Sequence, residues 1–379
     1  MKKLFFGFTA IFAALVLLFS SCNKGGSDKI LIGEYGSLTG TEATFGISST
    51  NGLKLAVEEI NKTGGLLNKQ IELITYDDQG KPSEAGTVVE KLINKDRVVA
   101  VIGEVASSRS KAGAPKCQLY KIPMISPAST NPEVTLIGDY IFRVCFIDPF
   151  QATVLSKFAL NTLKVKRVAI LKDIKNAYST GLSDFFEKEF KATGGEIIEV
   201  QSYSNGDKDF KAQLTAIRSK NPEAVFIPGY YTDVGLIAIQ AREIGITQPL
   251  FGGDGWESEK LTEGKAKDAL EGCYFSTHVS TENPDPGIQN FIKKYKEKFN
   301  MMPDAMSFLS YDAGMILFDA IKRAGSTEAQ KIRDELAKTK DFAGVTGKIT
   351  INDQRNAIKP AVILEIKGGQ FKYKETVAP

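Results

Sequence analysis

The chain has 379 residues, of which 42% are hydrophobic and 25% charged, and its formal net charge is +3 at pH 7. Residues 1–21 contain two lysines and no acid, so the rest of the chain carries +1. A charge this small and this evenly spread excludes the basic footprint of a nucleic-acid-binding protein. About 350 residues beyond the first segment exceed what one core usually serves, which favours two domains.

The first predicted element is an export signal. Residues 1–21 combine a basic start, an apolar run from Leu4 to Phe19 and two serines, which is typical of a secretory signal peptide. Cys22 follows directly, as in a bacterial lipobox, although Phe19 stands where leucine is usual. We therefore predict a lipid anchor on Cys22 and a tether over residues 22–28. The alternative is a plain signal peptide with an incidental cysteine.

Strands and helices then alternate in two consecutive series. In the first series we predict strands at 29–36, 69–78, 97–103 and 122–127, and helices at 48–65, 81–96 and 108–121. In the second we predict strands at 165–173, 196–204, 223–229, 249–254 and 271–277, and helices at 179–195, 209–222 and 231–245. From residue 287 onward we predict helices at 287–299, 305–324 and 326–339, followed by strands at 347–353 and 361–373.

The alternation predicts an α/β fold with two Rossmann-like lobes. The strand runs are almost continuously apolar, which is typical of parallel sheets covered by helices on both faces. Ligands of such sheets bind outside the carboxyl ends of the strands.

Two hydroxyl-rich loops fall at such strand ends. Ser107 follows one apolar run, and Ser129 and Thr130 follow the next. Hydroxyl groups and free backbone N–H groups at a helix start suit an anion such as a carboxylate. The alternative for Ser107 is a helix cap without a ligand.

The sequence argues against an enzyme and against a metal site. His278 is the single histidine, and no nucleophile elbow, P-loop or dinucleotide motif is present. For His278 we expect a structural role. Cys117, Cys145 and Cys273 lie far apart without metal-ligand spacing, so either one pair forms a disulfide or all three are buried thiols. We expect no cofactor.

Several segments together resemble one known family. They include "GSLTGTEATFG", "NGLKLAVEEINKTGGLLNKQIELITYDD", "IPMISPASTNPE", "AYSTGL", "PGYYTDVGLIAIQAREIG" and "FGGDGW". Their order is similar to that of the leucine/isoleucine/valine-binding protein family, the type I periplasmic binding proteins of amino-acid ABC transporters.

The resemblance implies two lobes joined by a three-crossover hinge that close on a solute. Lobe 1 is then expected at 29–147 plus 279–356, and lobe 2 at 148–278 plus 357–379. The crossovers are expected near 145–150, 276–281 and 354–360.

The resemblance also implies the polar groups of the binding site. Ser107 and Thr130 match residues that donate to the ligand carboxylate, and the Ala128 carbonyl matches an acceptor for the ammonium group. Ser129 is included with them. Asp254 matches the acid that receives the ammonium group, with a side chain one methylene shorter than in relatives. A free amino acid needs such partners, because burying either charge alone is costly.

The remaining wall is expected to be aromatic. Tyr178 and Tyr230 match tyrosines of the family, and Phe45 stands where relatives often have tyrosine. Trp256 is a further candidate, with packing inside its own lobe as the alternative. Such a lining favours an aliphatic or other apolar ligand side chain. Arg109 is expected to point to solvent from the first turn of its helix; if it entered the cleft, the ligand would be acidic or an amide.

The predicted function is therefore capture of an amino acid by an exported, monomeric lipoprotein that delivers it to an inner-membrane ABC permease. One alternative is a binding protein that senses an amide or other small polar solute without a transport role. The other is an enzyme on an α/β scaffold, for which the sequence lacks catalytic groups.

Overall fold

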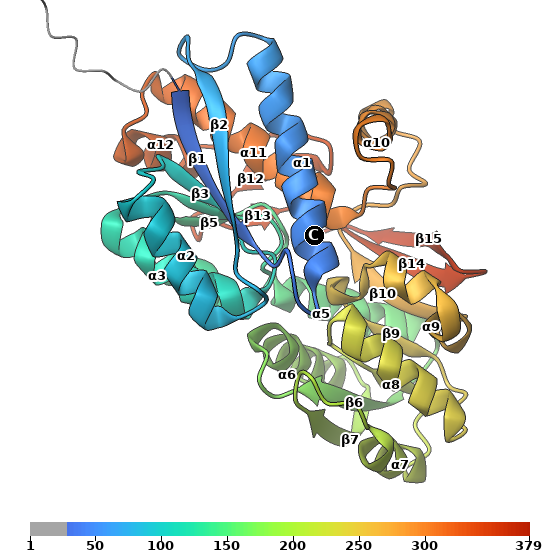
Figure 1. Cartoon of the computed structure of the whole chain (residues 1–379). Coiled ribbons are helices and arrows are strands. Elements are labelled where there is room, and N and C mark those ends of the chain that lie inside the picture. The colour runs from blue at the N-terminus through green and yellow to red at the C-terminus, as the bar shows by residue number, and fades with distance from the viewer. Residues whose placement is uncertain (1–28) are drawn as a thin grey trace, which may run out of the picture.

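The computed structural model describes residues 29–379 as two α/β lobes, each built around its own sheet (Figure 1). The predicted signal segment, Cys22 and the tether lie outside the described residues. Within residues 29–379, no helix combines the length and the apolar character needed to cross a membrane.

Lobe 1 contains a parallel sheet with the strand order β2-β1-β3-β4-β5. Its strands are β1 (Lys29–Gly36), β2 (Gln70–Asp77), β3 (Ala100–Ile102), β4 (Met124–Ser126) and β5 (Ile141–Arg143). The helices that follow these strands are α1 (Ala43–Lys62), α2 (Pro82–Asn94), α3 (Ser107–Tyr120) and the short α4 (Glu133–Leu136). Apolar residues of β1 and β3 are buried, except for the partly buried Leu31, as expected for a sheet covered on both faces.

Three C-terminal helices belong to the same lobe: α10 (Pro286–Phe299), α11 (Ala305–Ala324) and α12 (Ala329–Ala337). α11 packs along α1 (Figure 1). Gly52 of α1 allows this close approach, because a Cβ atom there would lie 2.0 Å from the carbonyl oxygen of Ser307. A small sheet of β11 (Phe342–Gly344), β12 (Gly347–Ile351) and β13 (Ala357–Ile358) completes the lobe.

Lobe 2 contains a sheet with the order β15-β14-β10-β9-β8-β6-β7. Its parallel strands are β6 (Arg167–Asp173), β7 (Glu196–Tyr203), β8 (Ala224–Phe226), β9 (Leu250–Gly252) and β10 (Cys273–Thr277). Its helices are α5 (Asp148–Lys157), α6 (Ala177–Ala192), α7 (Lys211–Ser219), α8 (Tyr231–Glu243) and α9 (Gly264–Ala269). A π-helical turn (Phe158–Thr162) extends α5, and two 3-10 turns (Asp254–Trp256 and Glu259–Thr262) follow β9.

The tail differs from the predicted pattern. The expected strand at 361–373 is two antiparallel strands, β14 (Ala361–Lys367) and β15 (Gln370–Val377). The chain reverses at Gly368 and Gly369, whose positive φ angles of 58° and 70° suit glycine. β5 and α5 were not predicted as elements.

The chain passes between the lobes three times: from β5 to α5, from β10 to α10, and from β13 to β14. The prediction of two Rossmann-like lobes with a three-crossover hinge is therefore confirmed. The exact residue limits of the lobes stay predictions.

Candidate functional site

The carboxyl ends of both sheets face one enclosed cavity between the lobes. Seven of the nine predicted binding residues line this cavity: Phe45, Ser107, Ala128, Thr130, Tyr178, Tyr230 and Asp254. Val105, Gly255 and Met306 also line it and were not predicted. The cavity is narrow, with about 10 Å³ reachable by the centre of a water molecule.

The lobe 1 side of the cavity carries the hydroxyl groups. Ser107 is the first residue of α3, and Ala106 occupies the N-cap without a side-chain cap bond, so the alternative of Ser107 as a cap is wrong. The Ser107 hydroxyl instead accepts from the backbone N–H of Asn131 at 3.2 Å. The Thr130 hydroxyl is buried and makes no hydrogen bond of normal geometry within residues 29–379. It lies beside the buried carboxyl group of Asp148, whose pKa it lowers against the effect of burial.

Ser129 was also predicted to bind the ligand, but it is not among the residues that line the cavity. Its hydroxyl lies 2.7 Å from that of Ser110 and donates to the carbonyl oxygen of Glu104 at 2.9 Å. Its backbone N–H donates to the Ser126 hydroxyl at 2.9 Å. Ser129 therefore joins the two hydroxyl-rich loops to each other and leaves the ligand contacts to its neighbours.

Trp256 is also absent from the cavity lining. Its side chain is fully buried, and its indole N–H donates to the carbonyl oxygen of Ile227 at 2.8 Å. The indole packs against β9, where a Cβ atom on Gly252 would lie 2.1 Å from Nε1. This arrangement matches the alternative given for Trp256, packing in the core of lobe 2.

Three aromatic rings form one wall across the lobe boundary. Tyr178 and Tyr230 of lobe 2 stack with their ring centroids 5.3 Å apart. Phe45 of α1 meets Tyr230 edge to face at 5.6 Å. The Tyr178 hydroxyl accepts from the backbone N–H of Gly255 at 3.1 Å, which fixes the ring beside the Asp254 turn.

Asp254 is the acidic side chain that lines the cavity from lobe 2. One carboxyl oxygen accepts from Gln151 Nε2 at 2.9 Å, and the other lies 3.2 Å from His278 Nε2. His278 is fully buried, and this burial lowers the pKa of its imidazole. Gln151 and His278 do not line the cavity themselves. No spacing in the sequence indicates that they meet Asp254, since they lie on separate segments.

Direct hydrogen bonds join the lobes around the cavity. On one side, the Thr44 N–H donates to the Tyr231 hydroxyl at 3.3 Å, and the Thr232 hydroxyl donates to the Thr41 carbonyl at 2.6 Å. On another side, the Ala177 N–H donates to the Ser108 hydroxyl at 2.9 Å. The lobes are therefore closed on the cavity.

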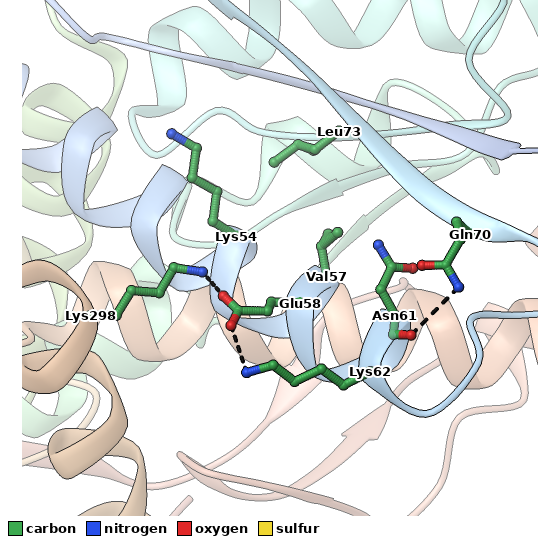
Figure 2. Close-up of a pocket in the computed structure, with 8 residues that line it drawn as sticks. All are labelled: Lys54, Val57, Glu58, Asn61, Lys62, Gln70, Leu73 and Lys298. Atoms are coloured by element: carbon green, nitrogen blue, oxygen red, sulfur yellow. Dashed lines mark hydrogen bonds and ion pairs between the residues drawn. The ribbon is translucent and has the colours of Figure 1, made fainter.

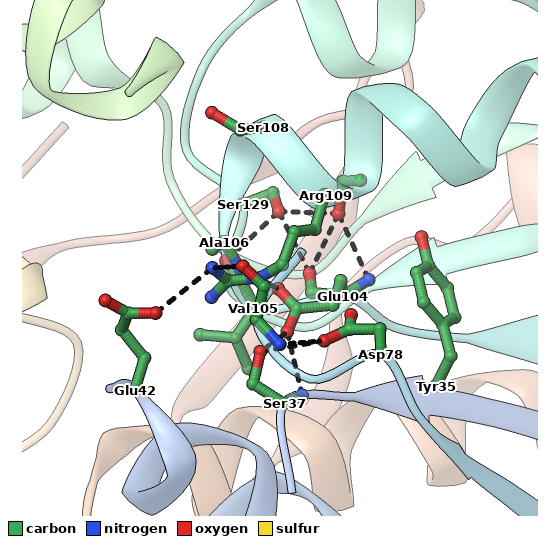
Figure 3. Close-up of polar contacts among 12 residues, drawn as sticks. Tyr35, Ser37, Glu42, Asp78, Glu104, Val105, Ala106, Ser108, Arg109 and Ser129 are labelled. Atoms are coloured by element: carbon green, nitrogen blue, oxygen red, sulfur yellow. Dashed lines mark hydrogen bonds and ion pairs between the residues drawn. The ribbon is translucent and has the colours of Figure 1, made fainter. Parts of the chain in front are cut away.

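Arg109 neither points to solvent nor lines the cavity, which corrects the expected exposure. Figure 3 shows its guanidinium group among acidic side chains. It is buried between two acids, with Nε 3.2 Å from Glu104 and an Nη atom 3.3 Å from Glu42. Ser37 donates to Asp78 beside this group, and burial raises the Asp78 pKa to about 7. The cluster is a buried ion-pair network in lobe 1. Glu42 extends it to lobe 2 by accepting from Asn205 at 3.2 Å.

Two other hollows lie outside this site. One is an open hollow over α1, β2 and α10, where Glu58 lies between Lys62 and Lys298 (Figure 2). It is a solvated charged surface, far from the carboxyl ends of the strands. The other, the hinge-side cavity, has about 710 Å³ reachable by water centres and is lined by His278, the segment 279–285, Thr346 and Val362, among others. It lies between lobe 1 and the β14–β15 hairpin.

Cys117, Cys145 and Cys273 are buried free thiols, so the alternative of a disulfide between two of them is not realised. Among residues 29–379, no group of histidine, cysteine and acidic side chains is arranged to hold a metal ion.

Residues 29–370 match the family model described as "Periplasmic binding protein". The chain belongs to the periplasmic binding protein family. The predicted resemblance is thereby confirmed, and the chain is a substrate-binding protein rather than an enzyme. Members of this family work outside the cytoplasm.

Curated relatives of this periplasmic binding protein include branched-chain amino acid binders. A leucine-, isoleucine-, valine-, threonine- and alanine-binding protein of Pseudomonas aeruginosa is 30% identical over 93% of this chain and 94% of its own length. The leucine-specific-binding protein of Salmonella typhimurium is 30% identical over 79% of this chain and 80% of its own length.

Two solved structures of amino-acid-binding proteins are also similar to this chain over most of its length. A leucine-binding protein from Thermotoga maritima is 39% identical, with a TM-score of 0.88 over 92% of this chain and 99% of its own. A branched-chain amino acid transporter substrate-binding protein from Streptococcus pneumoniae, solved in complex with isoleucine, is 33% identical. It also has a TM-score of 0.88, over 93% of this chain and 100% of its own.

Proposed function

We propose that the protein captures a free amino acid with an apolar side chain in the interlobe cavity and delivers it to an inner-membrane ABC permease. The observation that carries this proposal is the division of polar groups between the lobes. Ser107, Ala128 and Thr130 line the cavity from lobe 1, whereas Asp254 lines it from lobe 2. An α-amino acid has an anion and a cation on one carbon, so it can bind both sets at once.

The division also explains why the ligand favours closure. Ser107 and Thr130 donate to the carboxylate, the Ala128 carbonyl accepts from the ammonium group, and Asp254 completes the site only when lobe 2 swings in. Phe45 and Tyr230 then surround the side chain, which favours an aliphatic or other apolar group. The closed form that results is the state a permease can distinguish from the open form.

Export and anchoring form part of the same proposal. The signal-like residues 1–21 precede Cys22, on which we propose a lipid anchor that keeps the protein beside the permease. A single acyl chain binds membranes only weakly, so stable anchoring needs more than one chain on that cysteine. We propose that the protein acts as a monomer.

Native mass spectrometry of the purified protein, followed by calorimetry, tests the ligand. The titrations use leucine, isoleucine, valine, alanine and, for comparison, isobutyramide, which lacks both ionic groups. Binding of at least one amino acid and none of the amide supports the proposal. Binding of the amide alone would support the sensor alternative instead.

A further inference from the structure

The Asp254 carboxyl group makes hydrogen-bond contacts with residues in or next to two of the three connections between the lobes. Gln151 lies in the first turn of α5, just after the first connection, and donates to one oxygen at 2.9 Å. His278 lies in the second connection, between β10 and α10, with Nε2 3.2 Å from the other oxygen. Because a carboxylate oxygen only accepts, Nε2 carries the imidazole proton.

The His278 ring is held by few other contacts. It stacks on Phe146 of the first connection, with centroids 3.9 Å apart and planes at 25°. Its Nδ1 atom is buried and has no hydrogen-bond partner within residues 29–379. The ring is therefore oriented by Phe146 on its face and by Asp254 at its edge, and it also borders the hinge-side cavity.

We propose that His278 is a positioning residue for ligand binding: it aims the Asp254 carboxyl group at the ligand ammonium and links that contact to the hinge. This inference rests on the proposed capture of an amino acid. Each Asp254 oxygen accepts one bond from the hinge side, which leaves its other lone pair available for the cavity.

The charge state of the imidazole suits this role. Asp254 and Lys359 are the charged groups that act on His278, and burial outweighs the attraction of Asp254, so the imidazole stays neutral near pH 7. A neutral ring donates its bond without cancelling the negative charge that the ammonium needs. An imidazolium in this place would compete with the ligand for Asp254.

Two variants of His278 distinguish the effect of its hydrogen bond to Asp254 from the effect of its packing. His278→Gln keeps an N–H group close to the position of Nε2, whereas His278→Leu keeps the bulk and removes the donor. Calorimetry should use the amino acid that the wild type binds best. The His278→Leu variant should bind it about tenfold to a hundredfold more weakly than the wild type, because a hydrogen bond to a charged group is lost. The His278→Gln variant should bind the same amino acid within about threefold of the wild-type affinity.

The double variant with Asp254→Asn tests whether His278 acts through Asp254. Once Asp254 is asparagine, His278→Leu should weaken binding by less than about threefold more. Melting of the ligand-free variants shows whether folding is affected. If His278→Leu binds like the wild type, or if its loss is undiminished beside Asp254→Asn, the positioning role is wrong while the proposed function stands.

His278 is the only histidine in the chain, so nitrogen NMR of the untagged protein reports on it directly. At pH 7 the spectrum should show a neutral ring protonated at Nε2, and Asp254→Asn should shift the Nε2 signal. These signals need no ligand. If the wild type bound no amino acid, the proposed function would fail. Independently of that, an Nδ1-protonated ring would overturn the link between His278 and Asp254, and an imidazolium would overturn the role of His278 as a neutral donor.

Discussion

Phe45 and Tyr230 come from different lobes, and their rings meet edge to face with centroids 5.6 Å apart. Edge-to-face pairs of this kind are worth about 0.5–1.5 kcal/mol beyond the area they bury. Both rings line the cavity that Asp254 also lines, so their contact joins the two lobes beside the binding site. The contact between the two rings therefore stabilises the closed form, and the same rings shield the ligand from water.

The structure predicts that ligand makes the protein more compact. Without a ligand, the closed cavity holds the Asp254 carboxyl group with no cation opposite it, so the open form should be favoured. Small-angle scattering should show a smaller radius of gyration when a bound amino acid is present. Asp254→Asn at the same ligand concentration should keep the ligand-free value. An unchanged radius, with binding measured separately, contradicts hinge closure.

Asp254→Asn should weaken binding of an α-amino acid far more than it weakens folding. Loss of the charge opposite a buried ammonium group should cost roughly 2–4 kcal/mol of binding, or about 30- to 1,000-fold. The amide can still accept from Gln151 or His278, so the ligand-free melting temperature should change little. Calorimetry and thermal melts measure the two effects. Affinity within about threefold of the wild type would remove Asp254 from the binding site.

Asp148→Asn should stabilise the protein at high pH. Asp148 is fully buried, and burial raises its pKa from 3.8 to about 8. Between those values the folded protein holds a proton that the unfolded chain releases, so wild-type stability falls as the pH rises. Asparagine cannot ionise. The gain in unfolding free energy of the variant over the wild type should thus grow by roughly 3 kcal/mol between pH 5 and pH 8. Urea unfolding at both pH values tests this, and a pH-independent difference would contradict it.

Arg109→Met should destabilise lobe 1 by about 3–5 kcal/mol, because it leaves Glu42 and Glu104 buried without their cation. Lys111→Met is the matched control, since Lys111 pairs with Glu133 near the surface, where such a pair is worth about 1 kcal/mol or less. Urea unfolding of both variants compares them. Equal effects would show that burial of the Arg109 network adds nothing.

Cys22→Ser should abolish membrane association of the exported protein, because serine offers no thiol for a lipid. Fractionation of cells that produce each form measures the distribution. A variant that stays in the membrane fraction like the wild type would refute the lipid anchor.

Much of the fold was predictable, because hydrophobic alternation reports local structure. Apolar runs before Ser107 and Thr130 placed both loops at the ends of parallel strands, and the structure brings them to one cavity. Asp254 and the two tyrosines required the family resemblance, since nothing in their own spacing joins them to lobe 1.

What the sequence left open or missed has physical causes. Trp256 lies two residues after Asp254 in a 3-10 turn, so its side chain leaves in another direction and enters the core. Arg109 lies on a polar helix start that normally faces solvent, but Glu42 and Glu104 come to it from other segments. Met306 reaches the cavity from α11, a contact that depends on tertiary packing alone.

The three buried cysteines can report how often the protein opens, because each can be alkylated only when it becomes exposed. Alkylating reagents attack the thiolate, and burial raises the pKa of Cys145 to about 12. Cys117, Cys145 and Cys273 therefore react only in molecules that have opened locally or unfolded, and each labelling rate measures an opening free energy at its position. Cys145 lies where β5 leads into the first connection, so its alkylation follows exposure of the hinge itself.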